Sequence, residues 1–122
     1  MAMAINKVIV IGNLGANPEV RALPSGQNVA NFSLATTERF TDRNGDKQER
    51  TDWHRIVAFG RLADMCERFL SKGRQVYVEG RLRTRELEAK NNGGKRQRTE
   101  IVAARIQSLG VPPKERAEAA AV

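Results

Sequence analysis

Residues 51–61 read TDWHRIVAFGR, and this stretch determines how the rest of the chain is interpreted. It is typical of a β-strand, in which alternate side chains lie on the same face. Trp53, Arg55, Val57 and Phe59 therefore share one face of the expected strand. Aromatic rings beside guanidinium groups on an open sheet can stack on unpaired nucleic-acid bases. An ordinary half-buried strand with a core tryptophan explains this stretch equally well.

The composition is that of a small basic protein. The chain has 122 residues, which suits one domain and a short tail, and its formal net charge is +7. Such a surplus favours a polyanionic partner, and residues 81–98 concentrate it, with seven basic residues against two glutamates. Arginine outnumbers lysine 15 to 6, which suits phosphate binding and base stacking but also fits a GC-rich genome.

The residue types argue against an enzyme and against a membrane protein. Cys66 is the one cysteine, so no intrachain disulfide is expected, and no apolar run approaches the roughly 18 residues of a membrane span. We therefore expect a cytoplasmic protein with no membrane partner. One histidine and one cysteine provide no metal-ligand cluster, so we expect no metal, no cofactor and no catalysis. Asp42, Asp46 and Asp52 are too scattered for a nuclease magnesium site.

Hydrophobic periodicity and turn signals predict five strands and one helix. The strands are expected at residues 5–14, 28–40, 51–60, 74–85 and 99–109, and the helix at residues 61–72. Residues 19–23 are expected to be a short extended piece. Polar hairpin tips are expected at residues 41–48, around Asn44-Gly45, and at residues 88–95.

The order of these elements predicts the fold class. Three strands, a helix and two strands follow one another in the OB-fold, an all-β, five-stranded, partly open Greek-key barrel. Gly12 and Gly15 interrupt the first strand where a small barrel must bend. We expect this domain to span residues 1–110, with a short disordered tail at 111–122.

Four short motifs follow one another at characteristic distances. They read NKVIVIGNLG at 6–15, NPEVR at 17–21, TDWHRIV at 51–57 and VYVEGRLRTR at 76–85. Together they resemble the bacterial-type single-stranded DNA-binding (SSB) proteins over residues 5–109. The resemblance implies an OB-fold that binds and protects single-stranded DNA, without sequence preference, during replication, recombination and repair. It also implies a nucleoid-associated, non-enzymatic homotetramer, built as a dimer of dimers.

The resemblance implies which residues contact DNA and which contact other subunits. Base-stacking positions correspond to Trp53, Phe59 and Phe40. Basic positions near the DNA path correspond to Arg55, Arg61, Lys72 and Arg85. Positions at subunit contacts correspond to His54 and Gln75. For His54, a satisfied structural histidine or an exposed one is the alternative interpretation.

Alternation along the fourth strand adds one further candidate. Arg81, Arg83 and Arg85 project from one side of that strand, which places Arg83 in the same DNA-binding set. A solvated charged face explains Arg81 and Arg83 equally well.

Two departures from the family pattern change what is expected. Many members have a basic residue and a tryptophan after the Thr-Arg pair, where this chain has Glu86 and Leu87. We therefore expect somewhat weaker binding than in a member with the full aromatic set. The last residues, 115–122, hold no acidic tip of the kind that recruits replication and repair proteins. A truncated sequence and a tail-less member both explain this, and such partners are doubtful.

Two other functions remain open from the sequence. One is an OB-fold protein-interaction or primosome accessory module that binds nucleic acid secondarily. The other is RNA as the main ligand, because an open stacking face does not exclude a 2′-hydroxyl.

Overall fold

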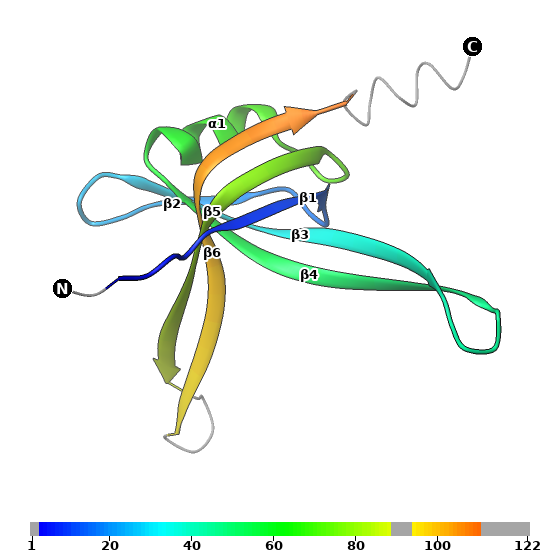
Figure 1. Ribbon diagram of the computed structural model, residues 1–122. Coiled ribbons are helices and arrows are strands. Elements are labelled where there is room, and N and C mark those ends of the chain that lie inside the picture. Colours follow the sequence, from blue (N-terminus) through cyan, green and yellow to red (C-terminus); the bar gives the residue numbers. More distant parts are fainter. Residues whose placement is uncertain (1–2, 89–93, 111–122) are drawn as a thin grey trace, which may run out of the picture.

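Five strands of the computed structural model close a barrel, and one helix covers one end of it (Figure 1). The structure describes residues 3–88 and 94–110. The elements are β1 (Val8–Leu14), β2 (Glu19–Ala22), β3 (Asn28–Thr41), β4 (Lys47–Phe59), α1 (Arg61–Phe69), β5 (Gln75–Glu88) and β6 (Lys95–Leu109). The barrel runs β1-β5-β6-β4-β3 and closes through a β1–β3 pairing. The predicted all-β OB-fold is confirmed.

Strand β2 is an additional strand that the sequence did not predict. Residues 19–23 were expected to be merely extended, but Glu19–Ala22 pairs with β3 at the sheet edge, through a turn held by Leu23 and Gln27. The first strand also begins later than expected, at Val8. Before it, the Asn6 side chain bonds both backbone groups of Leu82, at 2.8 and 2.9 Å, in place of a strand ladder.

The helix ends three residues earlier than expected. Leu70 has an extended backbone, with φ −106° and ψ 141°, so Lys72 and Gly73 lie in the following turn rather than at the helix end. The physical reason is packing. Leu70 is buried in the core together with Ala63 and Cys66 of the helix, and the chain must leave the helix there to enter β5.

The core consists of apolar side chains from all five barrel strands and from α1. Leu34 on β3, Ile56 on β4 and Val76 and Val78 on β5 are fully buried. Cys66 belongs to this core, as a small buried hydrophobe, and burial raises the pKa of its thiol to about 11. No helix within residues 3–88 and 94–110 is long and apolar enough to cross a membrane.

Two long hairpins, β3–β4 and β5–β6, extend away from the barrel (Figure 1). Their strands run beyond the predicted ends because cross-strand polar pairs continue the ladder. Beyond the predicted ends, these pairs include Arg39–Glu49, Glu38–Arg50 and Glu86–Lys95.

The two hairpin tips differ in what the structure describes. At the β3–β4 tip, backbone N–H groups of Asp46 and Asn44 donate to the Asp42 carboxylate at 2.9 Å, and they lower its pKa. Gly45, with φ +83°, completes the predicted Asn-Gly turn. The predicted flexible tip of the other hairpin falls largely on residues 89–93, and the predicted tail is residues 111–122. Both lie outside the described residues.

Candidate nucleic-acid interface

Trp53 is a surface residue and not part of the core. It lies on the part of β4 that leaves the barrel, and it is 61% exposed. One edge of the indole lies against Gly15, where a side chain would collide with ring atoms Cζ3 and Cη2. The backbone of Gly15 thus leaves room for the ring without covering it. This placement excludes a core tryptophan and provides an aromatic surface for stacking.

The other residues on the Trp53 face of β4 are more buried than Trp53 itself. Arg55 and Phe59 are half-buried and Val57 is buried, although Val57 lies on the face of β4 opposite the core residues Ile56 and Ala58. The Nε atom of Arg55 is buried and has no hydrogen-bond partner among the described residues. Its side chain borders a cleft of about 150 Å³ that also contacts Asn17 and Ser33. The shared face predicted from the sequence is therefore present, but only its outer end is open.

Arg83 lies over the ring of Phe59. Its Cζ atom is 5.6 Å from the ring centroid, which is a cation–π contact. The guanidinium group and the ring therefore form one combined surface, contributed by β5 and β4.

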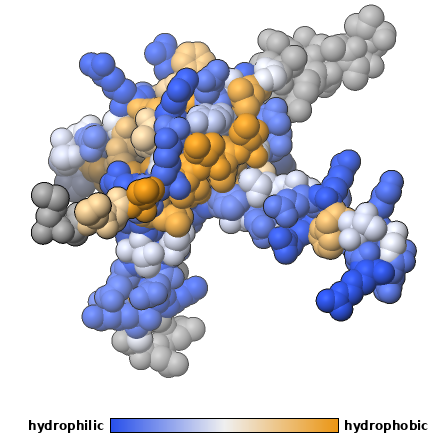
Figure 2. Space-filling view, in the orientation of Figure 1, coloured by the Kyte–Doolittle hydropathy of each residue, from blue (hydrophilic) through white to orange (hydrophobic). Residues whose placement is uncertain are grey.

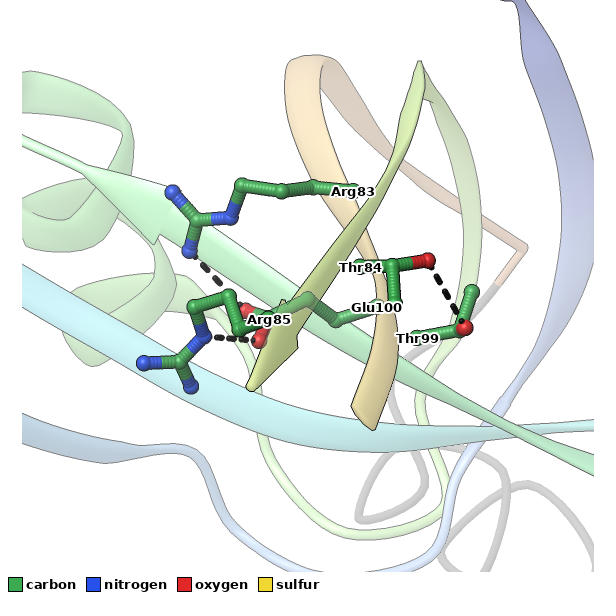
Figure 3. Close-up of polar contacts among 5 residues, drawn as sticks. All are labelled: Arg83, Thr84, Arg85, Thr99 and Glu100. Atoms are coloured by element: carbon green, nitrogen blue, oxygen red, sulfur yellow. Dashed lines mark hydrogen bonds and ion pairs between the residues drawn. The ribbon is translucent and has the colours of Figure 1, made fainter. Parts of the chain in front are cut away.

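Arg83 and Arg85 share a single buried carboxylate, as Figure 3 shows. Glu100 on β6 accepts from Arg83 Nη2 at 3.1 Å and from Arg85 Nε at 2.6 Å. Neither proposed interpretation of Arg83, a free DNA contact or a solvated face, included this carboxylate. One signal for this carboxylate is present in the sequence, since a lone glutamate precedes the apolar residues 101–103 in a segment otherwise rich in arginine.

Phe40 is not brought together with Trp53. It is exposed near the end of β3 and borders a broad hollow of about 620 Å³ with Arg39 and Lys47. Trp53 pairs with Ala35, and the register from there to Thr41 is continuous. Phe40 is five positions after Ala35, an odd number, so alternation places Phe40 on the opposite face of the hairpin. A DNA strand can contact both rings only by passing around this hairpin.

The remaining basic candidates lie near the helix. Arg61 begins α1 and borders a hollow with Arg68 and Phe69 on the helix surface. Lys72 is exposed in the turn after α1, and its backbone N–H donates to Asn17 at 2.8 Å. Both are exposed cations, and both are separate from the hollow that Trp53 borders.

The two residues predicted at subunit contacts lie on different strands. His54 is half-buried on β4, with its Nε2 atom 2.8 Å from the hydroxyl of Thr36. Gln75 is exposed at the start of β5, paired with Asn13 and Leu109. A third feature was not singled out from the sequence. Ile9 and Ile11 of β1 are half exposed, and Figure 2 shows apolar side chains gathered on this face of the barrel.

Comparison with known proteins identifies the family. The model of the "Single-strand binding protein family" matches residues 5–109. The chain belongs to this family. It is 56% identical over 110 residues to single-stranded DNA-binding protein 1 of Chlorobaculum tepidum, covering 90% of this chain and 68% of that relative. Members of the family are DNA-binding proteins rather than enzymes, in agreement with the sequence prediction.

Solved structures give the same result. A Plasmodium falciparum SSB in complex with single-stranded DNA matches with a TM-score of 0.82 and 39% identity, over 90% of this chain and 99% of that one. A deletion mutant of the Thermus aquaticus single-stranded DNA-binding protein matches with a TM-score of 0.77 and 36% identity, over 90% and 53% respectively. In the part of this SSB chain that the structure describes, no three His, Cys, Asp or Glu side chains are grouped to hold a metal ion.

Proposed function

We propose that this SSB-family chain binds single-stranded DNA without sequence preference and protects it during replication, recombination and repair, in the cytoplasm at the nucleoid. The observation that carries the proposal is the exposed indole of Trp53, beside Arg55 and the arginine pair on Glu100. An apolar ring of this size at the surface exposes area that a stacked base would cover. The names of its relatives support the same activity.

The proposed mechanism combines stacking with phosphate contacts. The DNA-binding residues are Trp53, Phe59, Phe40, Arg55, Arg61, Lys72, Arg83 and Arg85. Bases stack on Trp53 and on the combined Phe59–Arg83 surface, and the basic residues neutralise phosphates and release counterions. Every base has a π-face, so little sequence preference is expected. A duplex hides those faces and binds poorly.

The first prediction concerns the fluorescence of Trp53, the sole tryptophan. Titration with oligo-dT is expected to quench this fluorescence strongly at low salt, and the affinity is expected to fall as salt rises, because phosphate contacts release counterions. A duplex of the same length serves as the control and should quench little. Oligo-U in competition tests whether RNA is preferred. Absence of quenching at low salt would favour a protein-interaction module instead.

We also propose a homotetramer built as a dimer of dimers, with His54 and Gln75 at subunit contacts. The half-exposed Ile9 and Ile11 on β1 support an apolar contact between subunits, since exposed β-branched side chains on a strand are typical of such faces. One OB domain contacts few nucleotides, and linking four of them raises the effective concentration of each along the same strand.

The second prediction tests this assembly. Light scattering after size exclusion should give four times the chain mass of 13.6 kDa. Ile11→Glu should shift the mass to smaller species, because it places a charge in the proposed apolar contact. Ile5→Glu is the matched control, since Ile5 is exposed but lies outside the strands. A monomer at micromolar concentration would contradict the proposal.

A further inference from the structure

Glu100 is the one charged residue that is buried within the described part of the chain, and it is only 1% exposed. It lies on β6 directly opposite Arg83 of β5. A buried carboxylate is costly unless its oxygens are paired, and here each oxygen has its own arginine. Glu100 borders the same small hollow, of about 110 Å³, as Trp53 and Arg55. The buried charge is therefore next to the proposed stacking surface.

The hydrogen bond from Arg85 to Glu100 uses the Nε atom and leaves the two terminal nitrogens of this arginine available for another ligand. Arg85 bonds Glu100 through Nε, and neither of its two terminal nitrogens has a hydrogen bond to the carboxylate (Figure 3). The Arg85 side chain is 42% exposed. A guanidinium group binds a phosphate through two parallel N–H donors, and the two terminal nitrogens can supply them. Arg85 is thus held in an orientation suited to a phosphate.

Arg83 is fixed from two directions. Its Nη2 atom donates to Glu100, and its Cζ atom lies over the ring of Phe59. Its side chain is 33% exposed, so part of it is accessible from solvent. Without Glu100, the repulsion between Arg83 and Arg85 would be uncompensated, and both long side chains would regain rotational freedom.

We propose that Glu100 is a positioning residue for single-strand binding, which holds Arg83 on Phe59 and turns the terminal edge of Arg85 outward before DNA arrives. The proposal rests on the proposed function. Binding then avoids the entropic penalty of ordering two long side chains at the interface. Glu100 itself, buried under both arginines, does not contact the DNA.

The variant Glu100→Gln separates positioning from simple electrostatics, because the two predict opposite signs. Removing a negative charge near the DNA should strengthen binding and steepen its salt dependence if charge alone matters. If Glu100 positions the arginines, the amide can accept from only one of them, and binding weakens although the protein has become more positive. We expect the Kd for oligo-dT to rise about three- to tenfold, with no steeper salt dependence.

The matched control is Glu86→Gln, which removes an exposed negative charge from the same hairpin. Glu86 pairs with Lys95 and holds no arginine, so this variant should bind as tightly as the parent chain or more tightly. Glu100→Gln binding with an unchanged or lower Kd, in protein shown to be folded by circular dichroism, would overturn the proposal.

A second variant tests the proposal if Glu100→Gln does not fold. Arg85→Lys keeps the charge and can still pair with Glu100, but an ammonium group that does so has no separate edge for a phosphate. We expect the Kd to rise about three- to tenfold and the salt slope to fall by about 0.7, the value for one phosphate contact on a single strand. An unchanged Kd and slope would refute the positioning role.

The parent chain is titrated first in each series. Its failure to bind oligo-dT would refute the proposed function, whereas normal binding by the parent with unaffected variants would refute only the role of Glu100.

Discussion

Trp53→Ala is expected to weaken binding of oligo-dT by about 10- to 100-fold while leaving the fold intact. Stacking of one base on an aromatic side chain contributes about 1–3 kcal/mol, and each further 1.4 kcal/mol is a factor of ten in Kd. In a tetramer every subunit loses its ring. Because the indole is largely exposed, its removal leaves no cavity in the core, and the unfolding midpoint should change little.

Fluorescence anisotropy of a labelled oligo-dT measures this effect, since the variant no longer has a tryptophan to report on. Phe69→Ala is the matched control. Phe69 is exposed to the same degree, at 62%, but it lies on α1, where Arg68 covers its ring at 5.8 Å. The Phe69→Ala variant should bind oligo-dT with the Kd of the parent chain. Equal losses in both variants would mean that exposed aromatic area in general, rather than the Trp53 surface, supports binding.

The Trp53 strand shows how far local pattern predicts a site. Alternation correctly placed Trp53, Arg55, Val57 and Phe59 on one face, because a strand without bulges leaves no other arrangement. It did not predict that Trp53 is open while Val57 is buried. That difference depends on where β4 leaves the barrel, which is determined by the pairing partners β3 and β6.

Features that depend on non-local pairing were missed for the same reason. Glu100 is 15 residues from Arg85 in sequence, and only the register of β5 with β6 brings the two together. Phe40 was assigned to the same DNA path as Trp53, but the uninterrupted β3–β4 register places it on the other face of the hairpin. Its role as a DNA contact therefore remains a prediction that requires the strand to wrap.

Gly12 was predicted to mark a bend, and its surroundings explain why a glycine is required there. The β1 strand pairs with β5 over Val8–Asn13 and then with β3 at Asn13 and Leu14. A Cβ atom on Gly12 would overlap the carbonyl oxygen of Ala35. The contact is with backbone, which cannot rotate away, so the close approach of β1 to β3 needs a residue without a side chain.

We therefore expect Gly12→Ala to lower the free energy of unfolding by about 3 kcal/mol, the upper part of the range for steric overpacking in a core. Urea unfolding at one fixed protein concentration measures it, since assembly would make the midpoint concentration-dependent. Gly94→Ala is the control, because a Cβ atom there meets nothing within 4 Å. It should leave stability unchanged or slightly raised, as alanine restricts the unfolded chain more than glycine does.

If Gly12→Ala proved as stable as Gly94→Ala, strands β1 and β3 would have to be able to move apart without lowering the free energy of unfolding. Closure of the barrel would then depend on the other pairings alone. A destabilised variant whose Kd for oligo-dT also rises, measured below its unfolding midpoint, is the result we expect, because the displaced residue Ala35 is the register partner of Trp53. Gly12 at the β1–β3 seam and Trp53 on β4 share Ala35 as a neighbour, so closing the barrel and positioning the indole should be coupled functions of this chain.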